Sequence, residues 1–492
     1  MRSHFIRKLS QQIQRQLQKT RRIINMDEDM NMTAEVSDIK GNGLEVTSDI
    51  VLETEVIENF TGDGIAVIES GVEADLFEVE AVENGDDGFE IRGPVSDASV
   101  SIEKSAFNNN GDDGIDVFGD NNQVDLFRVE AAFNEEAGGL GVDGTNNNFN
   151  INLSEFESNQ DGLVIPRTGL GNTFNVNDSA FFDNTDDGID VFGNQNVFNL
   201  DSTSSTGNAE DGVEVDGSEN YIAATNSLFG DNGGDGFGDD KTATSNTFVF
   251  NSSSFRANGD DGLDIEGANQ TATLNNSVFE DNAEGGVELD GRDNYVTVEN
   301  RSAFDGNLDG FFIDYQGINN TVEVTDAGFR GNSDDGFDIL GSQNTISLFN
   351  VEVELNEDQG FEIDGDGNNA TITDSFIFSN SVSGLTIDIT GAYNNLAVND
   401  TAIYTNGGDG IDILGDDNTI DLLNVDVFDN GEWGMEVAGD GNMISIGSST
   451  FENNANGAIV LDGSNNTLII SDSGLTADDI IDNGSNNTIN FA

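Results

Sequence analysis

A glycine preceded by an acidic or small residue and followed by an apolar residue recurs about every 24 residues along almost the whole chain. After the first step, the spacing between successive register glycines varies by only a few residues. From Gly114 onward, Gly188, Gly262, Gly336 and Gly410 follow at equal intervals of 74 residues, so three short repeats make one longer repeat. A period of this length without helical apolar spacing is typical of stacked supersecondary units. The chain is therefore predicted to form an elongated solenoid.

The residues after each register glycine alternate between apolar and polar side chains. Ile189-Asp190-Val191 is one example, and Leu263-Asp264-Ile265 is another. Such alternation predicts a short strand with its apolar residues inside the wall, and it predicts that the middle residue faces water. Three short strands fit into one such repeat.

Two further columns keep the same register, one of amides and one of aromatic residues. Stacked amides can donate and accept hydrogen bonds along a column, and they would satisfy the polar groups of each turn. We interpret the aromatic residues as interior stacking material because the chain has 33 Phe, five Tyr and one Trp. The predicted amide ladder is Asn148, Asn172, Asn196, Asn220, Asn246, Gln270, Asn294, Asn320, Asn344, Asn369, Asn395, Asn418, Asn442 and Asn466. The predicted aromatic column is Phe107, Phe133, Phe156, Phe182, Phe229, Phe255, Phe279, Phe304, Phe329, Tyr404, Phe428 and Phe451.

This combination of coil length and asparagine column resembles the right-handed parallel β-helix of the pectate-lyase-like superfamily. The resemblance covers about residues 35 to 490 and includes no catalytic motif of that superfamily. It implies an all-β, right-handed solenoid, and the repeats predict about 18 coils. At about 4.8 Å per strand layer, that rod would be about 85 to 90 Å long.

Charge divides the chain into a basic leader, residues 1–25, and a single acidic domain, residues 26–492. The leader has no acidic residue, so the remaining domain has ten basic and 94 acidic residues, a formal charge of −84. Such a surface should repel nucleic acid and attract divalent cations, although acidity also suits a saline medium. The chain has no cysteine, and its one histidine, His4, lies in the leader, which excludes disulfides and histidine chemistry in the domain. No apolar run is long enough to predict a transmembrane segment.

The leader is predicted to form a basic amphipathic helix over residues 3–24. Phe5, Ile6, Leu9, Ile13 and Leu17 fall near helical spacing, and the residues between them are mainly polar or basic. It lacks the features of a cleaved secretory signal. Three roles remain open: a cap on the first coil, a contact with anionic lipid, and a self-assembly contact with an acidic neighbouring rod. The basic residues for a membrane or self-assembly contact are Arg7, Lys8, Arg15, Lys19, Arg21 and Arg22.

Carboxylates should stack in the solenoid at two positions, one before the register glycine and one two residues after it. Unit charges about 4.8 Å apart repel by roughly 1 kcal/mol in water, so bound cations or salt should offset the repulsion. Calcium is the natural ion because it accepts irregular sets of oxygen ligands. The alternative is that Asp-Gly pairs only satisfy turn geometry. The predicted calcium ligands are Asp112, Asp113, Asp116, Asp186, Asp187, Asp190, Asp260, Asp261, Asp264, Asp334, Asp335, Asp338, Asp409 and Asp412.

An enzymatic function has weaker support in the sequence. The resemblance implies polysaccharide lyases, epimerases or hydrolases, but the basic residues form no evident patch. Arg167 and Lys241 share a register, yet they are three coils apart. The most irregular segments, where an active site would be sought first, are residues 138–148, 166–171 and 233–244.

We therefore expect a non-enzymatic rod, extracellular or on a cell surface, which acts as a stalk, adhesin or assembly subunit and binds divalent cations. Export by a type I route without a cleaved signal fits this composition. A polysaccharide-active enzyme and a self-assembling filament subunit are the alternatives. Expected partners are divalent cations and either another copy of the chain or a surface polysaccharide, and nucleic acid is not expected.

Overall fold

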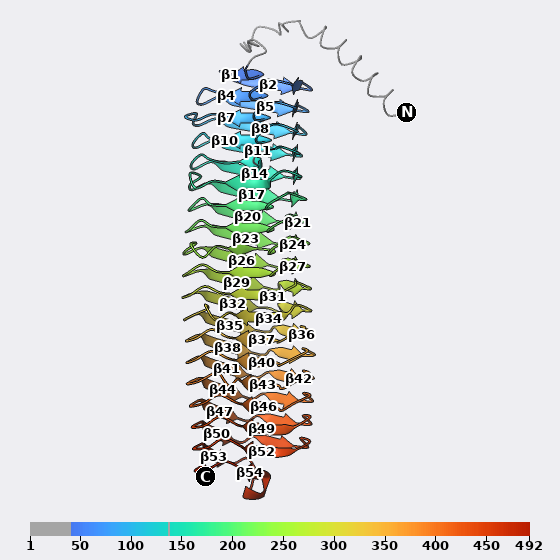
Figure 1. Ribbon diagram of the computed structural model, residues 1–492. Helices are drawn as coiled ribbons and strands as arrows, with labels where there is room; N and C mark the ends of the chain where they lie inside the picture. Colours follow the sequence, from blue (N-terminus) through green and yellow to red (C-terminus); the bar gives the residue numbers. More distant parts are fainter. Residues whose placement is uncertain (1–40, 136–137) are drawn as a thin grey trace, which may run out of the picture.

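The computed structural model describes residues 41–135 and 138–492, which form a straight parallel β-solenoid (Figure 1). Each coil spans about 24 residues, the spacing of Asn418 and Asn442 in successive coils, and all but the last coils contribute one strand to each of three faces. We call these faces sheets A, B and C. The first described coil lies at one end of the rod and the last at the other, in chain order (Figure 1). Sheet B contains 19 strands, so the rod has about 19 turns rather than the expected 18. The N-terminal helix predicted over residues 3–24 lies outside the described residues.

Sheet A carries the short strands that follow the register glycines. It is built from a nine-stranded and a ten-stranded segment, joined by a bridge between Phe237 and Leu263. Its strands are β1 (Leu44–Val46), β4 (Ile65–Val67), β7 (Phe89–Ile91), β10 (Ile115–Val117), β13 (Gly138–Gly141), β16 (Asp161–Ile165), β19 (Ile189–Val191), β22 (Val213–Val215), β25 (Gly238–Asp239), β28 (Leu263–Ile265), β31 (Gly285–Leu289), β34 (Asp309–Ile313), β37 (Phe337–Ile339), β40 (Phe361–Ile363), β43 (Leu385–Ile387), β46 (Ile411–Ile413), β49 (Trp433–Val437), β52 (Gly457–Leu461) and β54 (Ile480–Asp482).

The strands pair in parallel with the equivalent strands of the neighbouring coils, and a single bridge replaces this pairing between β25 and β28. In sheet A, Asp116 of β10 lies beside Glu90 of β7, and Ile115 lies beside Phe89. In sheet B, β11 (Gln123–Phe127) pairs in the same way with β14 (Asn148–Asn152). Because the register does not slip, residues that are equivalent in successive coils stack along the rod.

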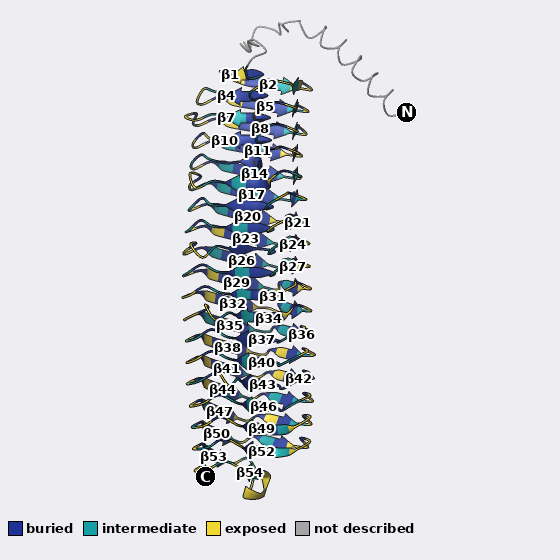
Figure 2. Ribbon diagram, in the orientation of Figure 1, coloured by how far each residue is buried: buried dark blue, intermediate teal, exposed yellow. Residues whose placement is uncertain are grey.

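The apolar columns fill the interior of the rod, which Figure 2 shows as a buried band along the sheets. Phe156 and Phe181 stack with ring centroids 5.0 Å apart, and Phe255 and Phe279 stack at 4.6 Å. The predicted aromatic column is wrong at several coils because strands of period two alternate sides. Phe133 is 55% exposed, and the interior position of that coil belongs to Ala131.

Later in this column, Phe181, Ile403 and Val427 point inward in place of the predicted Phe182, Tyr404 and Phe428. Tyr404 and Phe428 instead stack at 4.9 Å as neighbouring, partly exposed residues.

The predicted amide ladder exists between sheets A and B, with three one-residue corrections. The buried side chains are those of Asn147, Asn368 and Asn394, not of Asn148, Asn369 and Asn395. The backbone N–H of each ladder residue donates to the side-chain oxygen of the next residue along the ladder.

A second buried ladder, which the sequence analysis missed, lies between sheets C and A. It includes Asn110, Asn134 and Asn159, whose side chains also bond to one another. Both ladders satisfy turn groups that would otherwise be buried without partners.

The 74-residue period corresponds to one longer turn in every third coil. Residues 92–95, 166–169, 240–243, 314–317 and 388–391 each form a turn that is closed by a backbone hydrogen bond of 2.8 or 2.9 Å. These turns join sheet A to sheet B, and their tips are exposed at Arg167, Lys241 and Tyr315. The described residues include no α-helix, and none of their segments forms a helix long and apolar enough to cross a membrane.

Candidate metal centre

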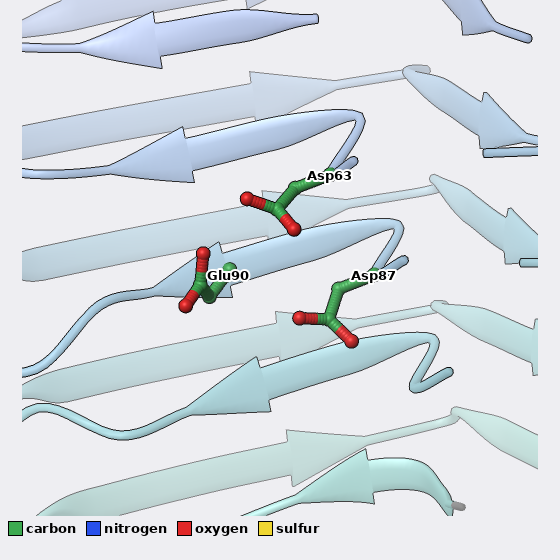
Figure 3. A group of neighbouring side chains, drawn as sticks. All are labelled: Asp63, Asp87 and Glu90. Atoms are coloured by element: carbon green, nitrogen blue, oxygen red, sulfur yellow. The ribbon is translucent and has the colours of Figure 1, made fainter. Parts of the chain in front are cut away.

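Carboxylates reach the outer face of sheet A from two positions in each acidic coil. The first is the residue before the register glycine, in the turn that enters the strand. The second is the residue at the centre of the strand. Figure 3 shows this arrangement for Asp63 and Asp87, which lie in the turns before β4 and β7, and for Glu90 on β7. The three side chains gather on one side of the sheet, and their ligand atoms lie within 4.8 Å of one another.

Three strand-centre aspartates are buried and two more, Asp264 and Asp412, are half-buried, which contradicts the prediction that these residues face water. Asp116 is 3% exposed, Asp190 is 5% exposed and Asp338 is 7% exposed. An aspartate side chain is short, and neighbouring strands lie only about 4.8 Å away on either side. Two turn aspartates also approach each strand-centre aspartate, one from the same coil and one from the coil before. Asp113 and Asp87 approach Asp116 in this way. These carboxylates therefore shield one another from water.

The turn aspartates use one carboxylate oxygen to join successive coils. The backbone N–H of Asp113 donates to Asp87 Oδ1 at 3.0 Å, and that of Asp187 donates to Asp161 Oδ1 at 3.1 Å. The same bond joins Asp335 to Asp309 at 2.8 Å. This hydrogen bond between successive turns thus occupies one oxygen of Asp87, Asp161 and Asp309. The second carboxylate oxygen is available to a ligand.

Only glycine fits at the register positions, because a side chain there would collide with the neighbouring coil. A Cβ atom at Gly114 would lie 2.8 Å from the side-chain nitrogen of Asn134 and 2.8 Å from the backbone oxygen of Gly139. The second amide ladder therefore packs directly against the turn that presents Asp113. The glycine lets the turn enter close to the core, and this approach fixes the position of the aspartate before it.

The strand-centre aspartates have an oxygen without a hydrogen-bond partner among the described residues. Oδ1 is buried and unpaired in Asp116, Asp190 and Asp338. A buried carboxylate oxygen without a partner is costly, and a bound cation or proton would remove that cost. The aspartates that share this feature are Asp116, Asp190, Asp264, Asp338 and Asp412, which occupy one position of the longer repeat, together with Asp290 and Asp364.

Burial raises the pKa values of these carboxyl groups, and the charge of neighbouring carboxylates raises them further. The pKa of Asp87 is raised to about 9, and the pKa values of Asp116 and Asp190 are raised to about 10. Burial also raises the pKa of Asp335 to about 11. The site therefore holds protons at neutral pH when no metal is bound, and a metal ion would have to displace them.

The predicted ligands fall into two groups in the structure. The ten that lie immediately before or two residues after a register glycine belong to the two stacked columns, and all are buried except Asp264 and Asp412, which are half-buried: Asp113, Asp116, Asp187, Asp190, Asp261, Asp264, Asp335, Asp338, Asp409 and Asp412. The other four, Asp112, Asp186, Asp260 and Asp334, lie one residue earlier and are partly exposed. Asp186 still forms an acidic group with Asp187 and Glu210.

The predicted ligand set omits the aspartate contributed by the preceding coil. The acidic groups join Asp161 to Asp187 and Asp190, and Asp87 to Asp113 and Asp116. The signal was present in the sequence, because Asp87 and Asp161 also precede register glycines. The leader residues predicted to contact membrane or another rod (Arg7, Lys8, Arg15, Lys19, Arg21 and Arg22) lie outside the described residues.

Two arginines share a groove on sheet C, although the sequence analysis found no basic patch. The groove has a volume of 540 Å³, and its lining includes Arg301, Arg330, Asp305, Asp326 and Glu352. Arg330 pairs with Glu354 and lies 3.9 Å from Glu352, whereas Arg301 makes no ion pair within the described residues.

An inserted residue and a glycine shape this groove. Three residues, 300–302, connect β32 (Tyr295–Glu299) to β33 (Ala303–Asp305), and two residues connect the corresponding strands of the next coil. Arg301 has a φ of 69°, so the inserted residue takes a left-handed conformation. A Cβ atom at Gly328, on the lining, would meet nothing within 4 Å.

The fold and the repeated turns define a parallel β-helix protein. The chain belongs to the family described as right-handed beta helix region, whose model matches residues 23–204, 206–377 and 268–426. This match confirms the handedness that the sequence resemblance implied. No curated protein sequence matches the chain.

Several solved structures are similar to this chain. A point variant of the periplasmic alginate epimerase AlgG is 12% identical, with a TM-score of 0.36, over 63% of this chain and 77% of that chain. Pectate lyase Pel9A is 15% identical, with a TM-score of 0.29, over 58% and 70%. The A-module of the Azotobacter vinelandii mannuronan C-5 epimerase AlgE4 is 10% identical, with a TM-score of 0.22, over 72% and 88%.

Proposed function

We propose that this protein is a non-enzymatic β-helical rod whose carboxylate clusters bind divalent cations, with calcium as the natural ion. It acts outside the cell or on its surface as a stalk, adhesin or assembly subunit. The observation that carries the proposal is the unpaired Oδ1 of strand-centre aspartates that are themselves more than nine-tenths buried, such as Asp116 and Asp190. Each lies within 4.8 Å of two turn carboxylates.

The composition of the clusters favours calcium over smaller ions. Calcium takes six to eight oxygen ligands in flexible geometry, whereas magnesium demands a near-ideal octahedron and keeps several waters. Each cluster offers carboxylate oxygens from two successive coils, such as Asp161 with Asp187 and Asp190. An ion at this place would join those coils and neutralise the charges that the fold has brought together.

The total charge supports a setting rich in divalent cations. A domain with a formal charge of −84 repels polyanions and concentrates counter-ions around it. Stability would then depend on the cation, which is an advantage for a rod that works only where calcium is abundant.

Thermal unfolding of the full chain at fixed ionic strength tests this function. We expect a large rise in Tm on adding calcium after EDTA, a smaller rise with magnesium, and calcium uptake in isothermal titration. Asp190→Asn should reduce the uptake, and Asp201→Asn, which changes an exposed aspartate on sheet B, should leave it unchanged. A Tm that follows ionic strength alone, with no calcium uptake, contradicts the proposal.

A polysaccharide-active enzyme is the second candidate function, and the groove on sheet C favours it. Arg301 is free to face a sugar carboxylate, and Asp305, Asp326 and Glu352 supply groups that could accept a proton or bind hydroxyls. Burial raises the pKa of Asp305, as a general acid or base requires. A lyase, epimerase or hydrolase acting on an acidic glycan is the reaction class that this lining suits.

A glycan assay separates the two candidate functions. The protein would be incubated with uronate-containing and neutral polysaccharides, and unsaturated products, reducing ends and epimerised residues would be measured. Activity that is lost in Arg301→Ala and Arg330→Ala supports the enzyme. Arg256→Ala is the matched control because Arg256 occupies the position equivalent to Arg330, 74 residues earlier, and does not line the groove. No turnover on any of these substrates removes the second candidate.

A further inference from the structure

One acidic cluster contains a cation supplied by the chain itself. Arg92 follows β7, two residues after Glu90, and its Nε lies 2.6 Å from Glu90 Oε2. Its Nη2 lies 2.6 Å from Asp63 Oδ2. The Asp63 side chain is only 2% exposed and that of Glu90 is 13% exposed, whereas the Arg92 side chain is 34% exposed. The guanidinium therefore approaches from the solvent side and covers Asp63 and Glu90, two of the three carboxylates shown in Figure 3.

Comparison along the 74-residue repeat shows that Arg92 occurs in the one repeat that also has an acidic residue, Glu90, at this strand-centre position. The strand-centre positions equivalent to Glu90 in later repeats are Val164, Gly238, Phe312 and Thr386, none of which is acidic. The positions equivalent to Arg92 are Pro166, Asp240, Asp314 and Asp388, none of which is basic. The acid at the strand centre and the base two residues later thus occur together in one coil, and neither is present at the equivalent positions of the later repeats.

We propose that the Arg92 guanidinium is an intramolecular cation that fills the Asp63–Asp87–Glu90 cluster, and that removing it opens a site for a divalent cation. This inference rests on the proposed cation-binding function. In the native protein the N-terminal acidic coils are then stable without metal. The clusters from Asp113 onward, whose strand-centre aspartates lack such a partner, depend on the ion.

Charge and geometry support this difference between the cluster that pairs with Arg92 and the later clusters. A guanidinium brings fixed donors that match carboxylates, and it stays charged at any pH at which the protein folds. Without Arg92, two carboxylates that are mostly buried would lose their only ion-pair partner among the described residues. Removing one partner of such an ion pair leaves an uncompensated charge, for which a divalent ion is the natural replacement.

Calcium titration of the full chain tests the inference, with calcium chloride as the probe. Arg92→Ala should bind about one more calcium ion per chain than the native protein, and its Tm in EDTA should be lower. Calcium should restore most of that loss. Arg92→Lys keeps a positive charge and should not gain the site. Lys104→Ala, which removes a cation paired with Glu103 at 2.8 Å on the surface, is the control for net charge and should also gain no site.

The outcomes distinguish this inference from the proposed function. If the native protein binds calcium and Arg92→Ala binds the same number of ions, the inference is wrong and the proposed function stands. If the native protein binds none and Arg92→Ala binds one, the proposed function and the ion dependence of the later clusters are wrong, and only the role of Arg92 in its own cluster stands. Arg92→Gln gives the same comparison if the alanine variant fails to fold, because it also removes the charge while keeping a polar side chain.

Discussion

The backbone N–H of Asp187 donates a 3.1 Å hydrogen bond to Oδ1 of Asp161, one coil earlier in the rod. This bond gives the turn aspartate a structural role that does not depend on any ligand. It also orients the carboxylate so that a ligand atom of Asp161 lies within 4.8 Å of ligand atoms of Asp187 and Asp190. The geometry that secures the turn therefore also brings the acidic cluster together.

The stability of the metal-free protein should fall as pH rises. Burial raises the pKa values of Asp87, Asp116 and Asp190 to about 9, 10 and 10 in the folded state, from the usual 3.8. Between the unfolded and folded pKa values, the folded protein holds protons that the unfolded chain has released, so each increase in pH favours unfolding. This stability is fully present below about pH 4 and is lost through about pH 10.

Thermal unfolding in EDTA at a series of pH values and constant ionic strength measures this dependence. We expect Tm to decrease steadily toward alkaline pH and calcium to flatten the curve. Calcium binding near neutral pH should also release protons into a weakly buffered solution. A Tm that rises with pH in EDTA would show that these carboxyl groups are ionised and satisfied in the folded protein.

Asp190→Asn should stabilise the metal-free rod and weaken its response to calcium. The substitution keeps the shape of the side chain beside Asp161 and Asp187, and it removes a carboxyl group that must take up a proton on folding because its pKa is raised to about 10. The free energy of unfolding of the metal-free protein should rise by about 1 to 3 kcal/mol at neutral pH, within the range of single buried polar changes. Urea unfolding with and without calcium measures both effects. Equal destabilisation under both conditions would indicate a packing role instead.

The buried amide ladder should be a major source of stability. Asn196 Oδ1 accepts the backbone N–H of Asn172 at 2.9 Å, and its Nδ2 donates to the backbone oxygen of Gly169 at 3.2 Å. Asn196→Ala leaves two buried backbone groups without partners, at a cost of about 2 to 4 kcal/mol. Asn199→Ala is the control because Asn199 is exposed and bonds only to Asn175 Oδ1, at 2.9 Å. Similar urea midpoints for the two variants would contradict this prediction.

The repeat could be predicted from the sequence because glycine spacing and amide columns report directly on stacking. Which residues of a strand face the interior of the rod could not always be predicted. Phe181 and Phe182 are adjacent, and a one-residue change in strand register exchanges inside and outside. The same ambiguity placed Asn148 rather than Asn147 in the ladder. Periodicity predicts the length and number of the coils. Whether a side chain points inward or outward depends on the residue at which its strand begins.

The burial of the acidic cluster was harder to predict than its composition. Alternation along β10 places Asp116 on the outer face, and an outer face is normally hydrated. The residue is buried because Asp87 and Asp113 approach it from two successive coils. Arg92 contacts Asp63 across successive coils for the same reason. Contacts between successive coils determine which charged groups are buried and which are paired. The sequence of a single coil does not show these contacts.

The register glycines should tolerate no side chain, in contrast to glycines of the outer wall. A Cβ atom at Gly236 would lie 2.6 Å from the backbone oxygen of Gly262 and 2.7 Å from the side-chain nitrogen of Asn258. Gly236→Ala must therefore separate two coils or disturb the second amide ladder, at a cost of about 3 kcal/mol. Gly328→Ala meets nothing within 4 Å and should be neutral or slightly stabilising, because alanine restricts the unfolded chain. Urea unfolding of both variants measures the difference. Because Asp235 immediately precedes Gly236, the register variant should also lower calcium affinity, and an unchanged affinity would mean that the turn and the acidic cluster are independent.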